Sequence, residues 1–161
     1  MNILVADRVY VKELSTEYVQ DYLDMFSTTV QKILGVSSLW NEFEYLHCQL
    51  KKQKEGKTFL YGIFEKSQDH LIGSIEIRSI EHRGQLYTWM HEDYWGKGLF
   101  QDAFALVRSD YFSKNKQITE FTARVDVSNN ASLKALLKAG CKSVRMCKGP
   151  RENQHEIICY R

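Results

Sequence analysis

Two glycines in the segment Tyr-Trp-Gly-Lys-Gly-Leu-Phe, residues 94–100, have the spacing that best fits a chemical task. An apolar stretch at 85–90 precedes them, and a helical pattern follows from residue 101. Glycine lets the backbone approach a ligand closely. The first N–H groups of a helix have no internal partner, and the helix dipole adds positive potential there. Gly96 and Gly98 therefore predict a phosphate site between a strand and a helix.

Backbone N–H groups at the start of the predicted helix would complete this site. They belong to Leu99, Phe100 and Gln101. Lys97 would screen the phosphate charge, or would simply lie in solvent at the helix entry. An ordinary strand-to-helix turn explains the same residues, so this segment alone does not decide between the two interpretations.

Length and composition restrict the class of protein. The chain has 161 residues, 43% of them hydrophobic, which predicts a single domain over residues 1–161 with one core. Lys and Arg number 22 and Asp and Glu 20, a balance that argues against a dedicated nucleic-acid partner. No apolar run approaches the ~18 residues of a membrane span. Charged residues follow the start too early for a signal peptide, so we expect a cytoplasmic location.

The four cysteines lie at positions 48, 141, 147 and 159. None forms a Cys-x-x-Cys pair, and no histidine cluster lies near them, so we expect no metal site. For a cytoplasmic chain this spacing predicts reduced, mostly structural thiols.

The order of elements predicts an α/β fold. Strands are expected over residues 8–13, 58–65, 70–80, 84–90, 118–127, 142–147 and 156–160. Helices are expected over residues 16–26 and 41–54, from the glycine turn to about 112, and over 129–139, where Gly140 would end the last one. This order predicts a mixed, mostly antiparallel central sheet of about seven strands, with helices on both faces.

Four stretches, in this order and spacing, resemble the GNAT superfamily of acetyl-CoA-dependent N-acetyltransferases. They are residues 7–14, 71–75 and 94–98, and residues 129–133 together with 138–140. The resemblance covers nearly the whole chain and is closest to the ribosomal-protein N-terminal (Rim-type) branch. It implies the GNAT fold, acetyl-CoA as co-substrate and an amine acceptor. Small relatives often form dimers, which makes a homodimer an expectation.

The resemblance also implies cofactor-binding residues in the glycine turn. Gly98 matches the family's pyrophosphate loop, whereas Trp95 stands where a Gln or Arg is usual. Phe100 stands where a small residue is expected, and it would either crowd the pyrophosphate or turn into the core. Asn129 matches an asparagine that touches the cofactor, and it also has the type and place of a helix N-cap.

The strand before the turn would contact the pantetheine arm through its backbone, as the matching strand of the family does. This role falls on Thr88, Trp89 and Met90. It needs a flared sheet, because a paired strand edge would have no free N–H group. One N–H group near Met90 or His91 would then hold the developing oxyanion of the thioester. An ordinary strand with Trp89 in the core explains the side chains equally well.

The resemblance leaves the proton-transfer residues open. Ser132 aligns with a serine that is proposed to protonate the leaving thiolate in some relatives, but a first-turn serine also bonds to backbone. The usual tyrosine and glutamate positions hold Leu136 and Val144. Substitutes for the general base are Glu76, His91 and Glu156. Glu76 is explained equally by an outward-facing position in a strand, and His91 by a solvated position at the end of a strand.

The missing glutamate and tyrosine bear on the acceptor. In the family mechanism a neutral amine attacks the thioester directly. An α-amino group has a pKa near 8 and is about one-tenth neutral at pH 7, whereas a lysine is below ~0.1% neutral. A site without a strong base should therefore prefer an N-terminal α-amino group of a protein or peptide. The alternatives are a small-molecule amine (an antibiotic, polyamine or amino sugar) and a non-catalytic CoA-binding module.

Overall fold

A single eight-stranded sheet organises the computed structural model, which describes residues 2–161. The spatial order is β1-β2-β3-β4-β5-β6-β8-β7. The strands are β1 (Leu4–Val5), β2 (Val9–Glu13), β3 (Thr58–Glu65), β4 (His70–Ile80), β5 (Arg83–Met90), β6 (Glu120–Asp126), β7 (Lys142–Lys148) and β8 (Asn153–Tyr160). The predicted mixed, mostly antiparallel sheet is confirmed. The short β1, which pairs with β2, is the strand that the sequence pattern did not predict.

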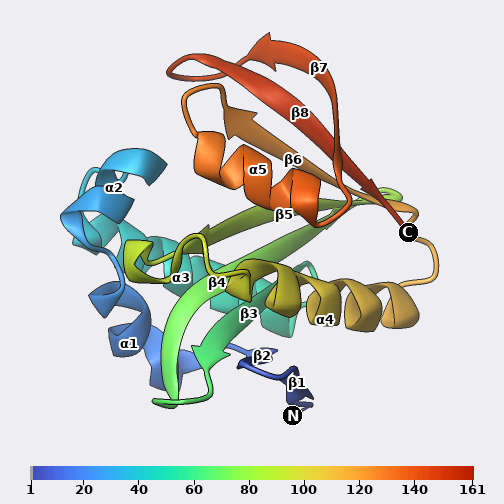
Figure 1. Ribbon diagram of the computed structural model, residues 1–161. Coiled ribbons are helices and arrows are strands. Elements are labelled where there is room, and N and C mark those ends of the chain that lie inside the picture. Colours follow the sequence, from blue (N-terminus) through green and yellow to red (C-terminus); the bar gives the residue numbers. More distant parts are fainter. Residues whose placement is uncertain (1) are drawn as a thin grey trace.

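The sheet divides between β5 and β6, its one parallel pair. The two strands are paired only from Arg83 to Gln85, opposite Glu120 to Thr122. Beyond these residues β5 remains paired with β4 up to Met90, while β6 pairs with β8 along its whole length. The sheet therefore separates into β1–β5 and β6–β8–β7, and the two parts diverge in Figure 1. We call the gap between β5 and β6 the split.

Helices cover the sheet on both faces. They are α1 (Val19–Asp24), α2 (Thr28–Leu34), α3 (Leu39–Lys54), α4 (Leu99–Lys114) and α5 (Asn130–Lys138). On the face that we call the front, α4 and α5 pack on one hydrophobic cluster that includes Phe104, Phe121 and Leu136. On the back, α1 and α3 pack on a second cluster around Tyr22, Leu46 and Leu60. Figure 1 shows α4 and α5 on either side of the split.

The region before α3 differs most from the prediction. The helix expected over 16–26 is a 3-10 turn (Thr16–Tyr18) followed by the short α1. An unpredicted helix, α2, follows it. Its N-cap is Ser27, whose Oγ accepts a hydrogen bond from the N–H of Val30, and it ends at Gly35, whose φ is +68°. Both end signals stand in the sequence, but seven residues are too few to show a helical period.

Helix α5 ends as predicted. Gly140 has a φ of +87° and donates its N–H to the carbonyl of Leu137, while Cys141 donates to Leu136. The prediction of reduced thiols is wrong for two cysteines, because a disulfide joins Cys141 to Cys159. The turn after α5 brings the start of β7 beside the end of β8, so their Cα atoms lie 4.3 Å apart. Cys48 and Cys147 are free.

Two kinds of feature are not found among residues 2–161. No helix there is long and apolar enough to cross a bilayer. No group of three or more His, Cys, Asp or Glu side chains there could hold a metal ion.

The front cluster supplies a stability prediction. Phe121 is fully buried and contacts Phe104, Tyr111 and Phe112. We expect Phe121→Ala to lower the free energy of unfolding by about 3–5 kcal/mol, because it removes apolar burial and leaves a cavity. Urea unfolding measures this. Trp40→Ala is the control, because Trp40 is 64% exposed, and a loss of the same size in both variants would contradict the assignment.

Candidate active site

A cavity of about 800 Å³ occupies the split on the front side. It is bounded by the end of β5, the glycine turn, the first turns of α4 and α5, and α2. Its lining includes the predicted residues Thr88, Trp89, Met90, Trp95, Gly96, Gly98, Leu99, Phe100, Gln101, Asn129 and Ser132. The structure thus brings together eleven residues that the sequence assigned to one site. Lys97, Glu76 and His91 are not in this lining.

The glycine turn presents unpaired backbone donors to the cavity. Gly96 and Gly98 have φ values of +70° and +76°, and Gly98 directly precedes α4. The first hydrogen bond of α4 runs from the N–H of Asp102 to the carbonyl of Gly98. Within residues 2–161, the N–H groups of Leu99, Phe100 and Gln101 have no backbone acceptor. Three donors at the positive end of a sixteen-residue helix can bind an anion.

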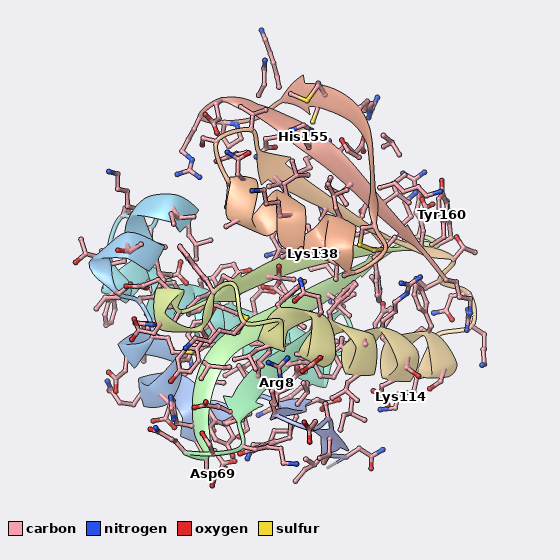
Figure 2. The ribbon with its side chains drawn as sticks, in the orientation of Figure 1. Arg8, Asp69, Lys114, Lys138, His155 and Tyr160 are labelled. Atoms are coloured by element: carbon pink, nitrogen blue, oxygen red, sulfur yellow. A yellow bond between two sulfur atoms is a disulfide. The ribbon has the colours of Figure 1, made fainter. Side chains whose placement is uncertain are left out.

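Arg8 holds this turn in place. It lies just before β2 and donates from Nη1 to the carbonyl of Lys97 (2.6 Å) and from Nη2 to Oδ2 of Asp102 (2.8 Å). Figure 2 shows Arg8 between the early strands and the start of α4. Arg8 could not be assigned to the site from the sequence, because its partners lie 89 and 94 residues further along the chain.

One edge of β5 is open toward the split. His91 donates its N–H to the carbonyl of Ile72 on β4 (3.0 Å). Successive peptide groups of a strand point to opposite sides, so the N–H groups of Met90 and Thr88 point toward β6. The β5–β6 pairing ends before them. Indole Nε1 of Trp95 donates to the carbonyl of Met90 (2.8 Å), so Trp95 anchors the turn to the strand.

Phe100 combines the two positions that the sequence left open. Its ring stacks on Phe104, with centroids 5.5 Å apart and planes 12° from parallel, and it packs on the front cluster. Phe100 is nevertheless also a lining residue of the cavity. Leu99 is buried in the core, so it offers the cavity mainly its backbone. Lys97 is exposed, with its Nζ 5.5 Å from the ring centroid of Tyr94.

Helix α5 forms the opposite wall. Oδ1 of its N-cap, Asn129, accepts a hydrogen bond from the N–H of Ser132 (3.2 Å), which confirms the capping role. Gln101 donates from Nε2 to the carbonyl of Ala135 (3.3 Å) and ties α4 to α5. Lys134 and Lys138 also line the cavity, one helical turn apart. Neither lysine was predicted as a site residue, although a spacing of four residues indicates a basic stripe on one face of a helix.

Helix α2 bridges the open end of the split. Val30, Ile33 and Leu34 line the cavity. The helix is fastened by Arg151 of the β7–β8 turn, whose Nη2 donates to the carbonyl of Ile33 (2.8 Å) and to Oδ2 of Asp126 at the end of β6 (2.5 Å). A guanidinium at a helix C-terminus also interacts favourably with the helix dipole. These residues were missed because α2 itself was not predicted.

Glu76 is 3% exposed on the back of β4, and both its carboxylate oxygens are engaged. Oε1 accepts from Nε of Arg78 (2.6 Å), and Oε2 accepts from the hydroxyl of Tyr45. Burial and the nearby Glu76 raise the pKa of the Tyr45 hydroxyl. The structure therefore places Glu76 in a closed network beneath α3, away from the cavity.

His91 faces a different cavity, of about 530 Å³, beside the β3–β4 turn. Its Nδ1 accepts a hydrogen bond from the N–H of Asp93 (3.2 Å). Leu136 is buried at the α5 wall, and Val144 is 47% exposed on β7. Glu156 lies on the back of β8 and is paired with Arg145. None of the substitutes for a general base lies in the lining of the split.

Solved structures of known proteins share this fold. A putative ribosomal-protein-serine acetyltransferase from Vibrio cholerae has a similar structure, with a TM-score of 0.83, 14% identity and coverage of 99% of this chain and 98% of that one. RimL, a ribosomal L7/L12 α-N-protein acetyltransferase solved with coenzyme A, has a TM-score of 0.80 and 14% identity, with coverage of 99% of this chain and 98% of that one. The microcin C7 self-immunity acetyltransferase MccE, solved with acetyl-CoA and AMP, has a TM-score of 0.79 and 14% identity, with coverage of 97% of this chain and 94% of that one.

Sequence comparison settles the family. No curated protein matches the sequence. The model of the acetyltransferase (GNAT) domain matches residues 8–142, which span β2 to the start of β7 and include both walls of the cavity. The chain therefore belongs to the GNAT family and is an acetyl-CoA-dependent acetyltransferase.

Proposed function

We propose that this acetyltransferase acts on a primary amine, and that the acceptor is the N-terminal α-amino group of a protein or peptide. One observation carries the choice of amine. Among the described residues, the lining of the split contains no histidine and no glutamate, and its single aspartate, Asp102, is paired with Arg8. Such a site favours an amine that is already partly neutral near pH 7.

The cavity suits acetyl-CoA in size and in the placement of its donors. The free N–H groups of residues 99–101 would hold the pyrophosphate, and Lys134 and Lys138 would add positive potential for the remaining phosphate. The open edge of β5 at Thr88 and Met90 would pair with the amide groups of the pantetheine arm, as a strand edge pairs with any extended chain. Bound acetyl-CoA supplies the acetyl group as a thioester.

The same arrangement assigns roles in the transfer. The N–H of Met90 would donate to the thioester oxygen as negative charge develops there. Because the carrier would fill the front of the split, the amine would approach the thioester from the back face. As the N–C bond forms and the C–S bond breaks, Ser132, whose hydroxyl has no hydrogen-bond partner among the described residues, would pass a proton to the departing sulfur, and the proton lost by the amine nitrogen would restore the hydroxyl. Asn129 would position Ser132 by capping α5.

The choice of amine can be measured directly. We expect a peptide with a free α-amino group and no lysine to be acetylated much faster at pH 7 than an N-terminally blocked peptide with one lysine. The pKa difference of about 2.5 corresponds to about 3.4 kcal/mol of deprotonation. Release of free CoA thiol measures both rates. Raising the pH should reduce the difference between the two acetylation rates. Comparable turnover of the two peptides at neutral pH would overturn the proposal.

Ser132 is tested by truncation. We expect Ser132→Ala to lower kcat by about 10²-fold, the lower range for a lost general acid, with little change in the Kd of acetyl-CoA. Ser132→Thr is the matched control, because it keeps a hydroxyl and should retain much of the activity. An unchanged kcat in Ser132→Ala would remove Ser132 from the mechanism, and a lost affinity would make it a binding residue instead.

The glycine turn is tested with a matched pair of glycines. Gly98 and Gly56 have φ values of +76° and +70°, and Gly56 lies after α3, outside the cavity lining. Alanine at either site should cost about 1–2 kcal/mol of stability, because the left-handed conformation is strained for it. Only Gly98→Ala adds a Cβ 3.1 Å from Nη2 of Arg8.

We therefore expect Gly98→Ala to raise the Kd of acetyl-CoA by about tenfold, or about 1.4 kcal/mol, measured by calorimetry. Gly56→Ala should leave the Kd unchanged. Equal affinities in the two variants would show that the turn does not hold the carrier.

A further inference from the structure

The back of β6, β8 and β7 is a sheet face without a covering helix in Figure 1, where α5 covers the front. Ala123 and Val125 of β6 belong to the front cluster, so Arg124, between them, projects to the back. The register places Arg124 beside Glu156 on β8, and Glu156 beside Arg145 on β7. Arg124 and Arg145 are both exposed.

Charges on this side of the sheet form two layers. Arginines lie outside, and a carboxylate lies beneath each of four of them. The exposed fractions of arginine and carboxylate side chains are 28% and 4% for Arg78 and Glu76, 50% and 11% for Arg83 and Glu120, 66% and 16% for Arg145 and Glu156, and 47% and 12% for Arg151 and Asp126. The carboxylates fix the guanidinium groups, and the groups that face solvent are cationic.

Arg124 has no salt-bridge partner among residues 2–161. A hydrogen bond from Arg145 lowers the pKa of its neighbour Glu156, and the charges of Arg145, Arg124 and Arg83 lower it further. We call Arg83, Arg124 and Arg145 the arginine face, because Arg78 lies in the network beneath α3 and Arg151 holds α2. Arg124 lies two residues beyond Thr122, the last β6 residue paired with β5, so this face borders the split.

We propose that the arginine face docks an acidic segment of the acceptor polypeptide, downstream of the amine that enters the split. This inference rests on the proposed function and adds the chemical class of the acceptor. Guanidinium groups bind carboxylates with paired, parallel hydrogen bonds, and groups already oriented by a neighbour lose less entropy on binding. The net charge of only +2 favours a carboxylate-bearing peptide over a nucleic acid.

A purely structural role for these ion pairs makes a different prediction. The carboxylate of each pair is largely buried, so removing a guanidinium leaves that carboxylate without its partner. If the pairs only join strands, such a change would lower stability and would leave the KM of every acceptor unchanged. If the arginine face docks an acidic segment, the effect would appear in KM for acidic acceptors and would weaken with salt.

The test uses two peptides that begin with the same serine and differ only in downstream glutamate or glutamine. We expect the wild-type enzyme to have the higher kcat/KM for the glutamate peptide at low salt. Arg124→Gln should lower that value about threefold, and Arg124→Gln with Arg145→Gln about tenfold, mainly through KM. The glutamine peptide should change less than about twofold.

Lys114→Gln is the control variant. Lys114 is an exposed lysine on α4, paired with Asp110 at 2.7 Å and far from β7 in Figure 2. The Lys114→Gln variant removes one exposed positive charge, so it measures the effect of net charge alone. Thermal unfolding of each variant separates a folding defect from a docking defect. Equal kcat/KM for the two peptides in the wild-type enzyme would overturn the proposal and leave acetyl transfer intact.

A binding measurement separates this inference from the proposed function. Fluorescence anisotropy with a labelled, N-terminally blocked glutamate peptide needs no turnover. Binding that is weakened in the double variant supports the arginine face even if no α-amine is acetylated, and in that case the proposed acceptor amine is wrong. Tighter binding of a single-stranded RNA than of the glutamate peptide would overturn the docking proposal in favour of a nucleic-acid partner.

Discussion

The site depends on how early the pairing of β5 and β6 stops. Three residues on each strand form the only parallel ladder of the sheet, and the two strands then diverge. This short ladder leaves the N–H groups of Thr88 and Met90 without a strand partner on the side of β6. An unpaired backbone group inside a protein is costly unless a ligand or water satisfies it. The split therefore offers hydrogen bonds that a bound extended chain can complete.

Much of the surrounding structure holds the two sides of the split at a fixed distance. Arg8 fixes the first turn of α4 from the β2 side, and Trp95 fixes the glycine turn to the end of β5. Gln101 connects α4 to α5 across the cavity. These contacts hold three backbone donors and one strand edge in one orientation, so little reorganisation is needed when an anion and a thioester bind.

Local patterns predicted the parts of the site that lie close together in the sequence. The glycine turn, the Asn129 cap and the ends of α5 follow from residue type and short spacing, and the structure has them where the pattern placed them. The resemblance to the GNAT family supplied the role expected of β5, which its alternating side chains do not reveal. Arg8, α2 and the two layers of charge on the back face could not be predicted in this way. Their partners are brought together only by the tertiary fold, as with Arg8 and Asp102, which are 94 residues apart.

Arg151 connects α2 to the end of β6 and so bounds the split at its open end. The β5–β6 ladder closes one end, and α2, held by Arg151 to Asp126, closes the other. The end of the split away from the ladder therefore depends on a single guanidinium group. A variant that lacks the Arg151 side chain would lose the hydrogen bonds that join α2 to the end of β6, while the β5–β6 ladder would not be touched.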